Sequence, residues 1–168
     1  HGVGVHPNTN SASLRAIGVG NVKTVDDGSA GIEFLQLVQS DPMKAGMQNV
    51  DIIFSNWQMH PVDGMMLLRW VRRHKESPNR FIPFVMVTGY ADREKVREAR
   101  AMGATEMLAK PFSVVNLGQR LLQVVNRPRK FVHTNKYFGP DRRRNQKEIP
   151  PDKCRRKINE RDVEVTHV

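Results

Sequence analysis

The chain has 168 residues and is 39% hydrophobic, which suits one ordinary domain with an appendage. No apolar run approaches the roughly 20 residues of a membrane span, no secretory leader is evident, and the single cysteine, Cys154, excludes an internal disulfide and fits a reducing cytoplasm. The formal charge is +10 and is uneven, because residues 1–126 carry 14 Lys and Arg against 11 Asp and Glu, whereas residues 127–168 carry 13 against 6.

The N-terminal part of the chain predicts few regular elements. Residues 1–13 are polar and rich in helix breakers, so we expect at most a weak, degenerate first strand at 2–5, with loop after it. The segment 14–17 is typical of the last turn of a helix, and Gly18 would end that helix. Residues 22–25 include β-branched side chains and predict a short strand.

The middle of the chain alternates helices and strands. An apolar face with helical spacing predicts a helix at 27–38, and a short apolar run predicts a strand at 50–55. A second helix is expected at 64–74. The continuous apolar run at 81–87 is typical of a strand buried on both faces, which begins just after Pro83.

The same alternation continues to the end of the domain. A charged helix at 91–102 stops at Gly103, and a last short strand follows at 106–109. Ser113 is placed to cap a final helix that ends before Pro128. Because strand alternates with helix throughout, the sequence predicts an α/β fold with a parallel sheet and right-handed crossovers.

The regular pattern dissolves after residue 127, so we divide the chain into a domain at 1–127 and a largely irregular tail at 128–168. The tail is basic and interleaves Phe131, Tyr137 and Phe138 with Arg and Lys. Such a segment can attract nucleic acid, an anionic surface or an acidic protein, and its aromatic rings can stack on bases. A solvated tail without a partner is the equally simple interpretation, because no RNA-binding fingerprint or recognition helix is present.

Three polar residues close or follow three successive strands: Asn56, Thr88 and Lys110. Adjacent parallel strands lie about 4.8 Å apart, and ligands of open α/β sheets bind at the carboxyl ends of the strands. We therefore expect these three side chains to converge at one edge of the sheet. A hydroxyl and an ammonium that flank a central position suit phosphoryl oxygens, although Thr and Lys are each common at strand ends.

These residues lie in motifs that resemble the receiver domain of two-component response regulators, over roughly residues 14–127. The block NWQMHPVDG, which starts at Asn56, resembles the signature after the third strand, VMVTGY holds Thr88 at the switch position, and KPF resembles the Lys-Pro motif at Lys110. The resemblance implies a CheY-like, flavodoxin-like doubly wound sheet of βα repeats in the order 2-1-3-4-5, with a cis bond between Lys110 and Pro111. It also places Asn56 at the phosphoacceptor position and Thr88 and Lys110 at phosphate contacts.

The departures from the family pattern bear on function. Phosphoryl transfer in receivers needs a carboxylate nucleophile and a Mg²⁺ ion held by hard oxygen ligands, whereas Asn56 is an amide. The family's acidic pair is expected near residues 5–6, which are Val and His, and Asp26 and Asp27 lie too near Asn56 in sequence to replace it. Met107 stands where the family has an aromatic switch residue. The Mg²⁺ site is therefore expected to be lost, and no other cofactor is indicated.

Partner contacts are expected on the face around this site. Trp57, Tyr90 and Met107 are the candidate contact residues, and the resemblance implies a histidine kinase or a downstream target as the partner. Residues 92–109 belong to the surface through which receivers commonly dimerise, so a homodimer through this face is an option. Residues 137–144 resemble the tail of some single-domain receivers, and that resemblance implies no established role.

We interpret the chain as a cytoplasmic pseudo-receiver of bacterial two-component, or phosphorelay, signalling. It is expected not to be an enzyme, not to be phosphorylated on Asn56, and to act through protein–protein contacts. Two alternatives stay open. In the first alternative, the chain is a working phosphorelay receiver that lacks its true first strand. In the second, it binds nucleic acid or an anionic surface through its basic tail.

Overall fold

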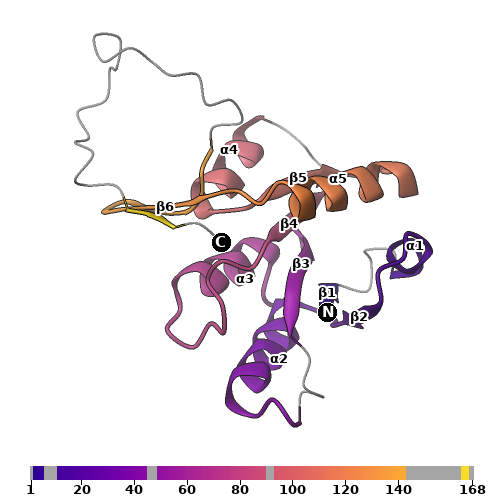
Figure 1. Ribbon diagram of the computed structural model, residues 1–168, viewed down its shortest axis with the longest axis horizontal. Helices are drawn as coiled ribbons and strands as arrows, with labels where there is room; N and C mark the ends of the chain where they lie inside the picture. The colour runs from indigo at the N-terminus through magenta and orange to yellow at the C-terminus, as the bar shows by residue number, and fades with distance from the viewer. Residues whose placement is uncertain (1, 6–10, 45–48, 90–92, 143–163, 167–168) are drawn as a thin grey trace.

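The computed structural model describes residues 2–5, 11–44, 49–89, 93–142 and 164–166. Its main sheet has five parallel strands in the spatial order β2-β1-β3-β4-β5 (Figure 1). The strands, in chain order, are β1 Gly2–Val5, β2 Asn21–Thr24, β3 Val50–Asn56, β4 Phe84–Thr88 and β5 Glu106–Ala109. The predicted α/β class and flavodoxin-like strand order are therefore confirmed.

Helices cover both faces of this sheet, with α2 and α3 on one side and α1 and α5 on the other (Figure 1). Their bounds are α1 Ser11–Ala16, α2 Gly28–Ser40, α3 Gly64–Arg73, α4 Arg93–Met102 and α5 Val114–Asn126. Side-chain oxygens of Asp27, Asp63 and Ser113 accept backbone N–H groups at the starts of α2, α3 and α5. None of the helices in the described ranges combines the length and the apolar character that a membrane crossing requires.

Side chains of the central strands alternate between two buried clusters. Ile52 and Phe54 of β3, with Val87 of β4, pack against α1 and α5. Ile53 and Met86 pack instead with α2, α3 and α4. Successive residues of a strand point to opposite faces, so this alternation shows that both faces of the sheet are covered.

The first strand, which the sequence left doubtful, is formed. β1 lies between β2 and β3 and pairs with both, so that Gly4 is aligned with Lys23 on one side and with Ile53 on the other. The expectation of loop up to residue 13 is wrong for α1, because the helix already begins at Ser11. Four strands that were predicted with more certainty begin and end within one residue of their expected positions.

The tail is more regular than the sequence indicated. Strands β6 Phe131–Thr134 and β7 Tyr137–Pro140 form an antiparallel hairpin, and β8 Glu164–Thr166 pairs with the other side of β6. The Thr134 hydroxyl closes the turn by accepting the N–H groups of Lys136 and Tyr137 at 3.3 and 3.0 Å. The expectation of an irregular tail is therefore wrong for residues 131–140, while residues 143–163 lie outside the described ranges.

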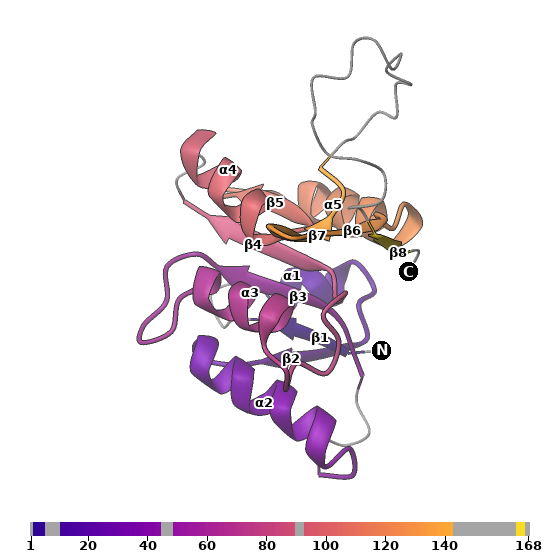
Figure 2. The same ribbon diagram turned by 90° about the vertical axis from the view of Figure 1, so that its left-hand side faces the viewer.

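The hairpin folds back on the domain, on the β5 side of the molecule and far from α2 (Figures 1 and 2). The ring of Phe81, just before β4, contacts the rings of Phe131 and Phe138 at centroid distances of 5.0 and 5.5 Å. A Cβ atom added to Gly139 would lie 2.8 Å from the Cα of Gly103, which precedes β5. The hairpin thus covers the amino-terminal edge of β4 and β5, which is the edge opposite to the predicted site.

Candidate functional site

The three polar residues singled out in the sequence lie at one edge of the sheet. Asn56 is the last residue of β3, Thr88 is the last residue of β4, and Lys110 directly follows β5. The register places Asn56 opposite Val87 and Thr88 opposite Ala109. Because the Lys110 N–H also donates to the Thr88 carbonyl at 2.8 Å, the three positions follow one another across adjacent strands.

Asn56 and Thr88 are buried, and Lys110 is half-buried. Helix α3 starts against the end of β3, because the Gly64 N–H donates to the Trp57 carbonyl at 3.0 Å. A Cβ atom at Gly64 would clash with the Asn56 carbonyl oxygen, so only glycine permits this close approach. The amide of Asn56 is therefore held in a packed environment rather than on an open loop.

The loop after β3 is fixed on its other side by the start of α2. The Gly28 N–H donates to the Val62 carbonyl at 3.1 Å, and a Cβ atom at Gly28 would lie 2.7 Å from that oxygen. The peptide bonds His60–Pro61 and Lys110–Pro111 are both cis, the second as the resemblance implied. These contacts define the backbone around the candidate site.

The polar groups that the structure describes at the strand ends do not match the donor set of a receiver-type magnesium site. The described strand ends offer an amide, a hydroxyl and an ammonium from Asn56, Thr88 and Lys110, whereas Mg²⁺ prefers carboxylate oxygens. The nearby carboxylates of Asp27 and Asp63 accept the N–H groups of Ala30 and Met66 at 2.9 and 2.8 Å, as helix caps. Among the described residues, no three His, Cys, Asp or Glu side chains are grouped as a metal site would need.

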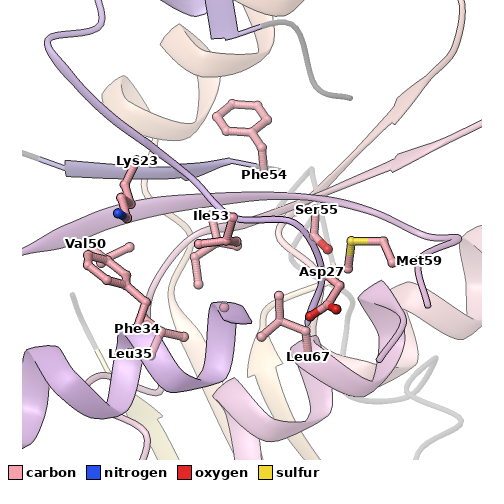
Figure 3. A pocket seen from close by; sticks show the side chains of 12 residues that line it. Lys23, Asp27, Phe34, Leu35, Val50, Ile53, Phe54, Ser55, Met59 and Leu67 are labelled. Carbon is pink, nitrogen blue, oxygen red and sulfur yellow. The ribbon is translucent and has the colours of Figure 1, made fainter. Parts of the chain in front are cut away.

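A small cavity lies beside the site, between β3 and helices α2 and α3 (Figure 3). Its volume is about 30 Å³, and Phe34, Leu35, Ile53 and Leu67 give it a mostly apolar wall, with Asp27 at its rim. This is room for little more than a water molecule. The cavity is therefore a packing defect in the core rather than a pocket for an organic ligand.

The predicted contact residues differ in their surroundings. Trp57 and Met107 are half-buried and pack against the cluster that includes Leu68 and Met86, so only part of each side chain faces outward. Tyr90 lies outside the described residues. Met66 of α3, on the same side of the sheet, is exposed by 54%.

An ion-pair cluster at the start of β5 was not predicted from the sequence. The Glu106 carboxylate is buried and pairs with Arg129 at 2.7 Å and with Arg120 of α5 at 3.7 Å. Arg129 precedes β6, so this cluster ties the hairpin to the sheet. An isolated Glu among apolar strand residues was the only available signal.

The aromatic residues of the tail are buried or stacked against other residues of the same chain. Phe131 is buried, and Phe138 lies under the guanidinium of Arg80 at 4.0 Å from the ring centroid. Tyr137 is covered in the same way by Arg142 at 4.2 Å. These rings stack on the protein's own arginines, so they are poorly placed to stack on nucleic-acid bases.

Comparisons with known proteins agree with this geometry. The family model for the response regulator receiver domain matches residues 8–122, which leaves the segment with β6, β7 and β8 outside the match. The chemotaxis protein CheY-3 of Vibrio cholerae is 29% identical over 114 residues, which make up 68% of this chain and 78% of that protein. The chemotaxis protein CheY of Pseudomonas aeruginosa is 28% identical over 114 residues, 68% of this chain and 82% of that protein. Among solved structures, the chemotaxis protein CheY4 of Vibrio cholerae is similar with a TM-score of 0.57 and 27% identity, over 73% of this chain and 97% of that chain.

Proposed function

This chain belongs to the response regulator receiver family of two-component signalling, and from that premise we propose that it signals without a phosphoryl group on residue 56. In this proposal the protein is a pseudo-receiver, which acts as a binding module and not as an enzyme. Its partners are signalling proteins, namely a histidine kinase or a downstream target. A cytoplasmic location is part of the same proposal.

One observation carries the proposal, namely the amide at the tip of β3. Asn56 is buried at the end of β3. The resemblance of the block NWQMHPVDG implies that the family has its phosphoacceptor aspartate at this position. An acyl phosphate forms by attack of a carboxylate oxygen on phosphorus, and a neutral amide oxygen is a much weaker nucleophile. An asparagine at this position therefore has nearly the shape and polarity of an aspartate but cannot form the acyl phosphate.

The donor set supports a second part of the proposal, that the site does not hold Mg²⁺. The first acidic residue in the sequence is Asp26, so the segment after β1 has no carboxylate to offer. Asp27 is engaged as the cap of α2. Phosphoryl transfer to receivers depends on a metal that neutralises phosphate oxygens, so losing the metal and losing the nucleophile disable the same step.

Thr88 and Lys110, together with the neutral amide at residue 56, suit a site whose charge does not change during signalling. Thr88 ends β4 and Lys110 follows β5, as the family pattern implies, whereas residue 56 carries a neutral amide instead of an aspartate. Phosphorylation cannot then alter the charge at the strand ends. The contact surface around Trp57 and Met107 would be presented constantly, and regulation would come from the abundance or location of the partners.

Incubation with acetyl phosphate and Mg²⁺, followed by intact-protein mass spectrometry, tests this function. We expect no species heavier by one phosphoryl group. An adduct that hydroxylamine removes and that peptide mapping assigns to β3 or its loop would overturn the proposal. Acetylation of lysine by the reagent, which needs no Mg²⁺ and releases phosphate, adds an acetyl group and is told apart by its different mass.

The presence of β1 speaks against the alternative that the chain is a receiver without its first strand. Residues 2–5 fill the position between β2 and β3, so the sheet has no strand missing at that place. The same mass measurement decides this alternative as well, because a working receiver gives the Mg²⁺-dependent adduct.

The alternative of a binder for nucleic acid or anionic surfaces is favoured only by charge, since residues 127–168 carry 13 basic against 6 acidic side chains. Binding of this kind weakens steeply with salt. A gel-shift titration at several salt concentrations, with the full chain and with a variant that lacks 143–168, tests it. Tight binding that persists after this deletion would assign the activity to residues 1–142 instead of residues 143–168.

A further inference from the structure

Helix α3 is the middle helix on its side of the sheet, between α2 and α4 (Figure 2). Its ten residues include three arginines and no acidic residue. The residues on its inner side are buried. Four residues on its outer side are exposed or half-buried, and we call them the α3 face: Met66, Arg69, Trp70 and Arg73.

The α3 face consists of two neighbouring ridges. Met66 and Trp70 lie four residues apart, and so do Arg69 and Arg73. Residues at this spacing lie one above the other on a helix, and with 3.6 residues per turn all four fall within a sector of roughly 100°. The face therefore presents an apolar ridge beside a cationic ridge.

The apolar ridge combines a fixed ring with an adaptable side chain. The inner part of Trp70 packs against the cluster that includes Leu68, and its ring stacks on that of His74 at a centroid distance of 5.2 Å and an interplanar angle of 17°. Met66 is 54% exposed, and the flexible thioether of methionine adapts to apolar partners of different shape. Such a ridge suits contact with the apolar ridge of another helix.

The cationic ridge has unused charge. Arg69 and Arg73 are exposed, and within the described ranges neither has an ion-pair or hydrogen-bond partner for its side chain. The carboxylates at the two ends of α3 are engaged elsewhere, because Asp63 accepts the Met66 N–H at 2.8 Å and Glu76 accepts a side-chain amide of α2 at 2.7 Å. Like charges four residues apart on a helix repel each other, so carboxylates from a partner would relieve this repulsion and accept hydrogen bonds from both guanidiniums.

We propose that the α3 face docks an acidic amphipathic helix of a partner protein. An apolar ridge of that helix would pack into the groove between the two ridges of α3, and carboxylates on its flank would pair with Arg69 and Arg73. Charge complementarity favours this occupant, because α3 itself offers a carboxylate no like charge. The proposal does not rest on the function proposed above, since none of these side chains belongs to the strand-end site.

Other anionic partners fit the α3 face less well. One side of the Trp70 ring is stacked on His74 and part of the ring packs inward, which leaves little area for stacking on nucleic-acid bases. Met66 is the one large apolar side chain that is exposed on α3, so insertion into an anionic membrane surface would bury little apolar area. The observations therefore favour a protein partner.

Fluorescence anisotropy with the full chain and a labelled helical peptide of about 18 residues tests the proposal. The peptide consists of Ala, Leu and Glu, with Leu on one ridge of its helix and Glu on the next. We expect saturable binding that weakens with salt and that is about ten-fold tighter than binding of a scrambled peptide of the same composition. In a Trp57→Phe background Trp70 is the single tryptophan, and its emission should shift to the blue as the peptide covers it.

Charge reversal on the α3 face gives a sharper test. In the double variant Arg69→Glu with Arg73→Glu, the affinity for the acidic peptide should fall by about ten-fold or more, and a peptide with Lys in place of Glu should bind instead. Arg93→Glu with Arg97→Glu is the matched control, since these arginines are also exposed and four residues apart, but on α4. The control changes the net charge equally and should bind the acidic peptide within about two-fold of the unchanged chain.

Met66→Ser tests the apolar ridge without altering the core, and it should weaken binding by about five-fold. Equal weakening by the α3 and α4 double variants would show general attraction to a basic chain and would overturn the proposal. Failure of the acidic peptide to bind would overturn it as well. So would tighter binding of a single-stranded oligonucleotide, or of anionic vesicles, that is lost in the α3 double variant.

Discussion

Arg72 and Arg80 hold each other through reciprocal hydrogen bonds. The Nη1 of Arg72 donates to the Arg80 carbonyl at 2.7 Å, and the Nε of Arg80 donates to the Arg72 carbonyl at 2.8 Å. Arg72 is fully buried and also donates from Nε to the Gly103 carbonyl at 3.0 Å. One buried guanidinium therefore links the end of α3, the segment before β4 and the segment before β5.

The tail hairpin completes the surroundings of this buried cation. The Phe131 ring lies 5.2 Å from the Arg72 guanidinium, and the Phe138 ring lies 4.0 Å from that of Arg80. Burial lowers the pKa of Arg72 to about 9, partly offset by Tyr137, so the side chain is still a cation at neutral pH. Backbone carbonyls and ring faces solvate it in place of water, which makes the hairpin part of the folded domain.

Replacing Arg72 by alanine should lower the free energy of unfolding by about 3 kcal/mol, because carbonyl acceptors lose their donors and a cavity is left. Urea denaturation followed by circular dichroism measures this. Arg73→Ala is the control, since its side chain is exposed on the same helix turn, and a change of about 0.5 kcal/mol or less is expected there. Equal effects of the two variants would show that Arg72 has no special structural role.

Replacing Phe138 by alanine should loosen the hairpin. The ring contacts Phe81 and Phe131 and lies under Arg80, so we expect a loss of about 2 kcal/mol in the free energy of unfolding. Hydrogen exchange should accelerate at the amides of β6 and β7. Lys136→Ala, in the exposed turn of the same hairpin, should change neither quantity. Unaltered exchange in Phe138→Ala would mean that the hairpin is held by other contacts.

The ionisation of Tyr137 in the hairpin makes the stability of the fold depend on pH. Burial raises the pKa of Tyr137 above its ordinary value, while the neighbouring guanidiniums of Arg142 and Arg72 oppose that rise. The folded protein therefore keeps the phenol proton at a pH where the unfolded chain releases it, so stability is retained below the unfolded value of 10.0 and falls as pH rises beyond it.

The chain has two tyrosines, so a Tyr90→Phe variant isolates Tyr137 for an ultraviolet titration of the phenolate. The folded variant should ionise at a higher pH than the same variant in urea. Coincident titration curves in the two conditions would contradict the assigned burial of Tyr137.

The sequence predicted the main sheet and the strand-end site because both rest on local patterns. The apolar runs at 50–55 and 81–87 predict β3 and β4 from their own residues, and the cap residue Ser113 predicts the start of α5. The first strand was harder to predict, because the two glycines in β1 weaken its own propensity. It is stabilised by pairing on both sides, which is a tertiary effect.

The hairpin and the buried arginine could not be predicted in the same way. Phe131 and Phe138 stand among charged residues, and what orders them is Phe81, some fifty residues earlier in the chain. Arg72 did leave one local signal, since it lies four residues after the buried Leu68 on the inward face of α3. A charge at such a position needs compensating groups, and these come from Arg80 and Gly103, which the local sequence does not reveal.

Restoring the carboxylate alone should not restore phosphorylation. In Asn56→Asp the nucleophile returns, but the groups that would hold Mg²⁺ beside it do not, because Asp27 stays engaged as a helix cap. We expect no Mg²⁺-dependent phosphoryl adduct with acetyl phosphate by intact mass, and no heat of Mg²⁺ binding by titration calorimetry. The matched variant adds Val5→Asp and His6→Asp, at the positions where the resemblance places the family's acidic pair, to Asn56→Asp, and it should recover both signals. A strong Mg²⁺-dependent adduct on Asn56→Asp alone would show that the loss at residue 56 stands by itself and that the metal site is intact.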